Sequence, residues 1–277
     1  MGLRIQNNIE AFNTHRQLSA TSAQASKSME KLSSGYRINR AADDAAGLAI
    51  SEKMRGQIGG LAQAQRNAQD GVSLVQTAEG ALNEVHSMLQ RVRDLKVQYE
   101  NGTLSDDDKT AIRTEGAALA SEIRSIQDKT AFNGTSLLKG SPATVAFQVG
   151  ANDGETVSAK TGDINAGAGM SEVTAAAAYA DDTAFGTTLT LADIDASIKE
   201  VSAIRSDFGA VQNRLEHRLS NLATYQENLT ASESRIRDVD MASEMTKFTK
   251  LNILQQAGTS MLAQANQAPQ GVLSLLR

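Results

Sequence analysis

The sequence contains no cysteine and no tryptophan, and only 4% of its 277 residues are aromatic. Without cysteine, the chain can form no disulfide bond and perform no thiolate chemistry, although this does not identify a compartment. The apolar fraction of 40% is rich in alanine, so any hydrophobic core has to be slender. Proline occurs only at Pro142 and Pro269. Most of the chain is therefore free to be helical, because proline disrupts helix interiors.

Charge and hydropathy also exclude several kinds of partner. The net charge is -5, and the basic residues are scattered among acidic ones, whereas nucleic-acid binding needs clustered Lys and Arg. No window reaches the roughly 20 consecutive apolar residues that span a bilayer. The first residues lack a hydrophobic signal core and a cleavage site, so ordinary secretion is not indicated. We expect neither nucleic acid nor a membrane as a partner.

No pattern in the sequence indicates an active site. His15, His86 and His217 fall in three different predicted helices, and none has a second ligand three or four residues away, as a zinc site would need. The run from Asp106 to Asp108 suits a helix N-terminus better than a cation loop. No Ser-His-Asp order, phosphate-binding loop or dinucleotide fingerprint stands out. We predict that the protein is not an enzyme and has no metal site and no cofactor.

Apolar residues recur at helical spacing over most of the chain. They predict helices over 3–32, from Asp43 to about Asn101, from Ser105 to about 126, and over 190–236 and 241–276. Gly35 can take the positive φ that ends the first helix. Thr190 and Asp193 form a capping box before a heptad-like seam that makes 190–236 the strongest coiled-coil segment. Glycines inside the second helix predict close approach of another helix.

Between these helices the period changes to about two. The segments Thr144–Val149 and Glu155–Ala159 flank Asn152-Asp153-Gly154, which predicts a β-hairpin. The stretch 162–188 has little periodicity and is expected to be irregular. The fold class we predict is mainly α: a long antiparallel helical coiled-coil rod with a small β-hairpin region, in which the N- and C-terminal helices pair.

The two ends of the chain carry only a thin apolar stripe. Such a seam is typical of helices that pack against each other and against neighbouring copies. Because the ends bury too little to offset their ordering entropy, we expect them to fold on assembly. The predicted assembly interface consists of Ile5, Ile9, Phe12, Met245, Phe248, Leu251, Leu254, Met261, Leu273, Leu275 and Leu276.

Four blocks of sequence resemble bacterial flagellin, the filament subunit of the flagellum. They are KLSSGYRIN at 31–39, AADDAAGLAI at 41–50, LQRVRDL at 89–95, and ILQQAGTS at 253–260 followed by AQANQ at 263–267. The resemblance implies a subunit that self-assembles into an extracellular helical filament for swimming motility. It also implies export by the flagellar type III apparatus without a cleaved signal peptide, and as partners the export chaperone, the filament cap and the hook-junction proteins.

The resemblance further implies a domain organisation. Residues 1–42 and 237–277 would form an inner domain that lines the filament's central tube and is disordered before assembly. Residues 43–161 and 190–236 would form the rod domain. Residues 162–189 would be a short variable insert that stands where many flagellins carry outer domains.

Host recognition is a further implication of the resemblance. Toll-like receptor 5 recognises many flagellins through the helix face that matches Arg91, Leu95 and Glu115. The C-terminal segment Leu273 to Arg277 resembles the tail that NAIP receptors sense inside cells.

Three other classes of protein remain open from the sequence. A hook-junction protein shares the terminal pattern but usually departs from the block matches. A chemoreceptor-like signalling coiled coil has similar Ala/Gln-rich heptads but normally needs a membrane span. An enzyme would need a convergent polar site.

Overall fold

The structure is a computed structural model that describes residues 8–139, 144–165, 167–181 and 184–275. Within these ranges, the side chains of residues 168, 176, 177 and 268–275 are not described. The chain divides into two compact units. The terminal unit comprises Met1–Gly56 and Asn228–Arg277, and the central unit comprises Gln57–Glu227. The domain limits expected at 42/43 and 236/237 stay predictions.

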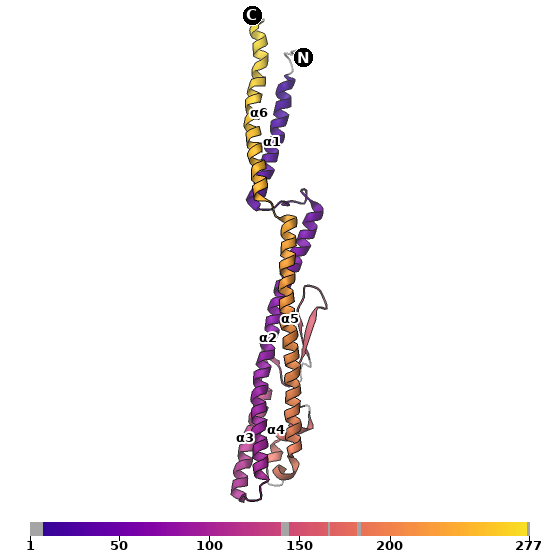
Figure 1. The fold of residues 1–277 in the computed structure, drawn as a ribbon, viewed down its shortest axis with the longest axis vertical. Coiled ribbons are helices and arrows are strands. Elements are labelled where there is room, and N and C mark those ends of the chain that lie inside the picture. The colour runs from indigo at the N-terminus through magenta and orange to yellow at the C-terminus, as the bar shows by residue number, and fades with distance from the viewer. Residues whose placement is uncertain (1–7, 140–143, 166, 182–183, 276–277) are drawn as a thin grey trace. The chain divides into compact units, whose positions relative to one another are not determined.

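The terminal unit is built around an antiparallel pair of helices. Helix α1 (Ile9–Ser34) and helix α6 (Met241–Leu275) run side by side (Figure 1). Asn8 Nδ2 donates to the carbonyl oxygen of Ala265 at 2.7 Å, and Ser28 Oγ donates to Glu244 Oε1 at 2.5 Å. These bonds lie near opposite ends of α1 and fix the register of the pair.

Local chemistry sets the ends of α1. Asn8 caps its start, with the side-chain oxygen accepting from the Ala11 amide at 3.0 Å. Gly35 ends it at φ 75°, and its amide donates to the Lys31 carbonyl at 2.9 Å. Only glycine adopts this conformation without steric cost, so the predicted break at Gly35 is confirmed.

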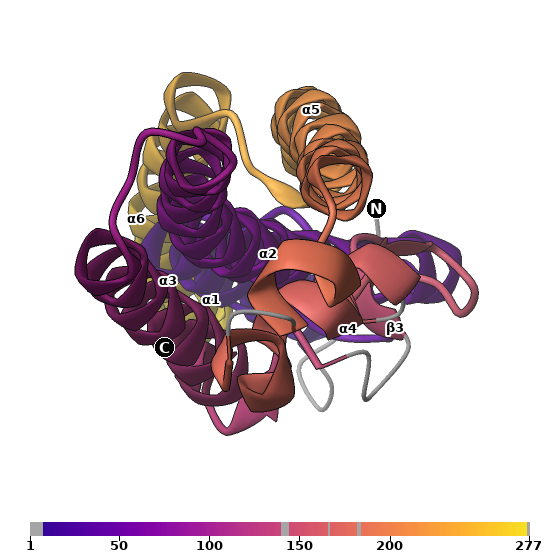
Figure 2. The same ribbon diagram turned by 90° about the horizontal axis from the view of Figure 1, so that it is seen from below.

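The central unit contains three long helical segments, seen end-on in Figure 2. Helix α2 (Ala45–Tyr99) and helix α5 (Leu191–Arg237) are antiparallel, as shown by ion pairs between Arg93 and Asp195 at 2.7 Å and between Arg205 and Glu79 at 3.9 Å. Helix α3 (Asp106–Lys129) returns along α2. Side chains that are fully or almost fully buried in this unit include Leu82, Val85, Leu89, Val92, Ile123, Val201, Phe208 and Leu215.

Helix α3 starts at a capping box. Ser105 is the N-cap, and Ser105 and Asp108 satisfy each other's backbone amides. The hydrogen bonds from Ser105 lower the pKa of the Asp108 carboxyl. The aspartates at 106–108 thus belong to a helix start, as their sequence position predicted.

Two antiparallel hairpins follow α3. Strands β1 (Ala131–Phe132) and β2 (Thr135–Ser136) flank Asn133 and Gly134, both of which have positive φ. Strands β3 (Thr144–Gln148) and β4 (Thr156–Lys160) pair with Phe147 opposite Val157, and Gly154 lies at φ 83° in the turn. The second hairpin was predicted from the sequence, and the first was not.

The stretch expected to be irregular is partly helical, and that expectation is wrong there. It forms α4 (Ala168–Thr174), a 3₁₀ turn η1 (Ala176–Tyr179) and a π-helical turn η2 (Ala184–Thr188). Met170, Val173, Tyr179 and Phe185 are buried, so this stretch completes the core of the central unit. The prediction failed because the apolar side chains of this stretch are isolated in the sequence. They pack against α2 and α3 without forming a periodic face.

A buried lysine holds this stretch in place. Lys96 of α2 is 0% exposed, and its Nζ donates to the carbonyl oxygens of Phe185 at 2.8 Å and Gly186 at 3.1 Å. Glu100 lies 3.3 Å from the same nitrogen. The ammonium group therefore has partners that compensate for its lost hydration.

Glycine permits close approach at one point of the α2–α5 contact. A Cβ atom at Gly71 would lie 3.1 Å from Leu215 Cδ1 and 3.2 Å from Phe147 Cγ. At Gly56, Gly59 and Gly80 a Cβ would meet nothing within 4 Å, so the predicted close approach is wrong for those three positions. The predicted mainly α fold, with paired terminal helices and a small β region, is confirmed.

Candidate assembly surface and receptor face

The large apolar side chains that are exposed concentrate in the terminal unit. Nine of the eleven exposed large hydrophobic residues described belong to it: Ile9, Phe12, Met29, Ile50, Met241, Met245, Ile253, Leu254 and Met261. Phe12 is 71% exposed and Ile253 61%. Exposed apolar surface is typical of interaction sites in soluble proteins, so the terminal unit is the candidate interaction surface.

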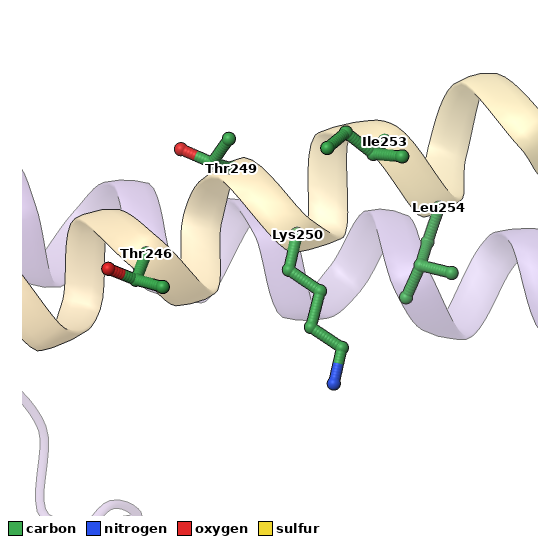
Figure 3. Close-up of a pocket in the computed structure, with 5 residues that line it drawn as sticks. All are labelled: Thr246, Thr249, Lys250, Ile253 and Leu254. Atoms are coloured by element: carbon green, nitrogen blue, oxygen red, sulfur yellow. The ribbon is translucent and has the colours of Figure 1, made fainter.

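A shallow groove of about 460 Å³ follows α6 across this surface. Its walls are Thr246, Thr249, Lys250, Ile253 and Leu254, which Figure 3 shows on successive turns of the helix. Thr249 and Ile253 point to the same side of α6 (Figure 3). The lining offers mainly aliphatic and methyl groups, which suits packing against another helix better than binding a polar small molecule.

The predicted interface residues fall into three groups. Ile9, Phe12, Met245, Leu254 and Met261 are exposed, and Phe248 is half-buried. Leu251 is only 6% exposed, so it lies in the seam of the α1–α6 pair and not on the free surface. Ile5, Leu276 and the side chains of Leu273 and Leu275 lie outside the described residues.

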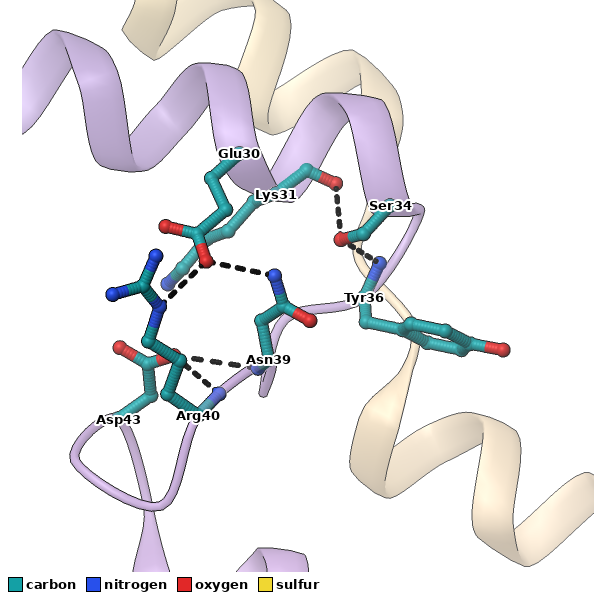
Figure 4. Close-up of polar contacts among 7 residues, drawn as sticks. All are labelled: Glu30, Lys31, Ser34, Tyr36, Asn39, Arg40 and Asp43. Atoms are coloured by element: carbon teal, nitrogen blue, oxygen red, sulfur yellow. Dashed lines mark hydrogen bonds and ion pairs between the residues drawn. The ribbon is translucent and has the colours of Figure 1, made fainter.

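The segment between α1 and α2 is tied to the end of α1 by a polar network (Figure 4). Glu30 Oε1 accepts from Asn39 Nδ2 and from Arg40 Nε, both at 2.8 Å. Asp43 Oδ2 accepts from the backbone amides of Asn39 at 3.3 Å and Arg40 at 3.1 Å. These backbone hydrogen bonds lower the pKa of the Asp43 carboxyl, that of Arg40 contributing most.

The same segment is joined to the chain before α6. The Arg37 amide donates to the Arg237 carbonyl at 2.6 Å, and the Val239 amide donates to the Gly35 carbonyl at 3.0 Å. The Arg237 guanidinium lies 4.8 Å from the centre of the Tyr36 ring, and its Nη1 lies 2.6 Å from Glu52 Oε1. The two ends of the sequence are thus held together by backbone and side-chain bonds where both helices of the pair begin or end.

The predicted receptor face is only partly formed. Arg91 Nη2 lies 2.6 Å from Glu115 Oε1, and both side chains are about half exposed. Leu95 is 1% exposed and belongs to the hydrophobic core of the central unit. Leu95 therefore does not share the exposed surface of Arg91 and Glu115, because α2 turns this side chain toward the core. The receptor face formed by Arg91, Leu95 and Glu115 stays a prediction.

Sequence reasoning missed several features of these surfaces. Ile253 and Met29 are exposed beside the predicted stripe. Polar residues around them interrupt the regular apolar spacing, so the periodicity did not indicate them. Lys96 gave no signal at all, because a lysine on a helix is normally solvated. In the part of the chain that the structure describes, no three His, Asp or Glu side chains gather as metal ligands. None of the described helices is long and apolar enough to span a membrane.

Comparison with known proteins gives consistent matches to one family. The bacterial flagellin N-terminal helical region matches residues 5–143, and the bacterial flagellin C-terminal helical region matches residues 191–276. A flagellin of Halalkalibacterium halodurans is 54% identical over 274 residues, which cover 99% of each chain. A flagellin of Bacillus subtilis is 52% identical over 304 aligned positions, covering 99% of this chain and all of the relative.

One solved structure shares the fold more distantly. It is a flagellar hook-associated protein from Vibrio parahaemolyticus, 17% identical, with a TM-score of 0.60 over 71% of this chain and all of that one. At this identity the likeness concerns the fold alone.

Proposed function

Since the chain belongs to the bacterial flagellin family and is a structural subunit of the extracellular flagellar filament, we propose that its terminal unit supplies the contacts that hold neighbouring copies together. The observation that supports this is the concentration of exposed apolar side chains on α1 and α6. Packing these side chains against other copies removes their surface from water, which favours association.

Assembly and folding of the terminal unit are coupled in this proposal. The described side chains of the terminal unit include only four buried hydrophobic ones: Ala25, Ile38, Leu251 and Ala265. Fixing each residue of a helix costs about 1 to 2 kcal/mol of conformational entropy. The α1–α6 pair therefore needs neighbouring copies to become stable, and in dilute solution it opens.

Within this surface, the residues have different roles. Leu251 joins α1 to α6 within one copy. Ile9, Phe12, Met245, Phe248, Leu254 and Met261 contact other copies. Ile5, Leu273, Leu275 and Leu276 stay proposed members on sequence grounds.

Replacing Leu254 and Met261 with Asp tests the proposal. We expect the L254D/M261D variant to form no filaments in electron micrographs, because packing would bury two unpaired carboxylates. The matched control is Leu251→Asp, which should instead weaken the α1–α6 pair within one copy. Normal filaments from L254D/M261D would contradict the assignment of this surface.

Export and assembly need further partners in the proposal. We assign export to the flagellar type III apparatus, without cleavage of a signal peptide, and contacts with an export chaperone, the filament cap and the hook-junction proteins. The test is the N-terminal sequence of the chain recovered from sheared filaments. A terminus beginning within the first residues supports the route, whereas loss of a segment of 15 or more residues would indicate a cleaved signal.

A second proposed role is that of a host-receptor ligand. The exposed Arg91–Glu115 pair presents a guanidinium beside a carboxylate on the central unit, and such Arg groups often anchor interfaces. We expect R91A/E115A to weaken signalling through Toll-like receptor 5 in reporter cells. Asp195→Ala, which removes a partner of a similar ion pair at Arg93, is the control. NAIP sensing of the segment from Leu273 to Arg277 stays a proposal from sequence.

A further inference from the structure

The exposed methionines of the terminal unit are the main oxidisable side chains of the chain's surface. The sequence has eight methionines and neither cysteine nor tryptophan, so methionine is the side chain that peroxides oxidise most readily. Met29, Met241, Met245 and Met261 are each about half exposed or more, and all four lie in the terminal unit. By contrast, Met170 in the central unit is 0% exposed.

The register of the α1–α6 pair groups these side chains into levels. Met29 and Met245 each directly follow a member of the hydrogen-bonded pair Ser28 and Glu244, so they occur at the same level. Met261 lies between Gly258, where a Cβ would be 3.1 Å from Leu18 Cδ1, and Ala265, whose carbonyl accepts from Asn8. Phe12 lies between Asn8 and Leu18 on α1 and so shares the level of Met261. Both ends of the pair thus carry an exposed thioether.

We propose that these methionines are sites of reversible peroxide oxidation that blocks assembly of the free subunit and spares the assembled filament. The proposal rests on the function proposed above, because it requires the same surface to be covered by other copies. In the reaction, a sulfur lone pair attacks a peroxide oxygen and the O–O bond breaks. One oxygen forms the S–O bond of the sulfoxide and the other leaves as water, so that sulfur loses two electrons and the peroxide gains them.

Polarity is the reason for the block. A sulfoxide converts a flexible apolar side chain into a polar one that accepts hydrogen bonds. Burying that oxygen against an apolar neighbour, without a donor, disfavours the packed state. In the filament, the neighbouring copies cover the sulfur atoms, and peroxide no longer reaches them.

Peroxide treatment before or after polymerisation tests the proposal. Monomer is treated with dilute hydrogen peroxide, the peroxide is removed, and each methionine is assayed by peptide mass spectrometry. We expect sulfoxide at Met29, Met241, Met245 and Met261 but not at Met170. The critical concentration for polymerisation should rise about tenfold or more, and methionine sulfoxide reductase should restore it.

A matched variant isolates the thioethers from other peroxide damage. M29L/M241L/M245L/M261L keeps apolar side chains of similar volume, so it should polymerise like the native chain and be indifferent to peroxide. Preformed native filaments treated in the same way should show several-fold slower oxidation at the four positions.

The outcomes separate this inference from the function on which it rests. If untreated chain polymerises and the oxidised chain, with sulfoxide verified, polymerises at the same concentration, the inference fails and the assembly surface stands. Equal oxidation rates in monomer and in intact filaments would also overturn it. If the untreated native chain forms no filaments, the assembly surface and this inference fail together.

Discussion

The terminal and central units use long helices in different ways. Among the side chains that the structure describes, 33 buried hydrophobic ones belong to the central unit and four to the terminal unit. The central unit surrounds α2 with α3, α5, a hairpin and the turns at 168–188, whereas the terminal unit pairs α1 mainly with α6. Both units are built from helices of 24 or more residues, so the difference in buried apolar surface comes from how many faces of each helix are covered.

The two units also differ in how many large apolar side chains they expose. Apart from the nine in the terminal unit, the exposed large hydrophobic residues described are Val97 and Tyr225. The central unit buries its apolar surface within one copy, whereas in our proposal the terminal unit buries its exposed apolar side chains against neighbouring copies. Each of the following changes tests one side of this contrast.

Removing a central core side chain should have the largest effect. Phe208 on α5 is 2% exposed, and Phe208→Ala should lower the free energy of unfolding by about 3 to 5 kcal/mol through lost burial and a cavity. Urea unfolding followed by circular dichroism measures this. Tyr225→Ala, at an exposed position of the same helix, is the control and should change it by about 0.5 kcal/mol or less. Equal effects would show that the central core does not hold this unit together.

Removing the buried lysine should lower the free energy of unfolding somewhat less than removing Phe208. Lys96→Ala deprives the Phe185 carbonyl of its charged donor and opens a cavity, so we expect a loss of about 2 to 4 kcal/mol in the free energy of unfolding. Lys96→Met fills the volume but not the hydrogen bond, and should recover part of the loss. A fully stable Lys96→Met variant would mean that the ammonium contributes nothing to holding the η2 turn.

The cap of α3 is a smaller contributor. Ser105→Ala removes the hydroxyl that accepts from the Asp108 amide and should cost about 1 kcal/mol. Ser87→Ala, in the middle of α2, is the matched control because its hydroxyl bonds only to the preceding turn. Hydrogen exchange at the first turn of α3 locates the effect. If that turn stays protected in Ser105→Ala, the capping box is dispensable.

The smallest expected effect is that of acid pH on the terminal unit, through the carboxyl group of Asp43. Because the Asp43 pKa lies below its ordinary value of 3.8, the ionised carboxylate is the form that the fold favours. Its contribution is present above that ordinary value and is lost as the pH falls through the lower folded value. We expect the amides of Asn39 and Arg40 to lose protection in this acid range.

The control for this titration is Asp43→Asn, which cannot ionise. In that variant the two amide signals should no longer follow a carboxyl titration. Identical acid profiles for both proteins, measured by nuclear magnetic resonance, would exclude Asp43 as the group responsible.

Sequence periodicity was enough to predict the long helices and the β3–β4 hairpin. The Gly35 break and the Thr190 and Asp193 capping box followed from local rules, and the pairing of the chain ends followed from the apolar stripe that each end carries. Burial was harder to predict. Leu95 and Leu254 both look like members of a helical stripe, yet one lies in the core and the other on the surface, because their exposure depends on which neighbours cover each helix.

The prediction for the stretch 162–188 failed for a related reason. Its apolar residues are irregularly spaced, so no helical period marks them, and contacts with α2, α3 and α5 order the stretch. Lys96 could not be recognised either, since its two carbonyl acceptors lie about 90 residues away in sequence.

Hydrogen exchange of the native chain, as dilute monomer and as filament, measures directly whether α1 and α6 fold on assembly. We expect amides of α1 and α6 to exchange rapidly in the monomer and slowly in the filament, while those around Val85 and Leu89 in α2 are slow in both. Slow exchange of α1 and α6 in a dilute monomer, unchanged on polymerisation, would contradict this expectation.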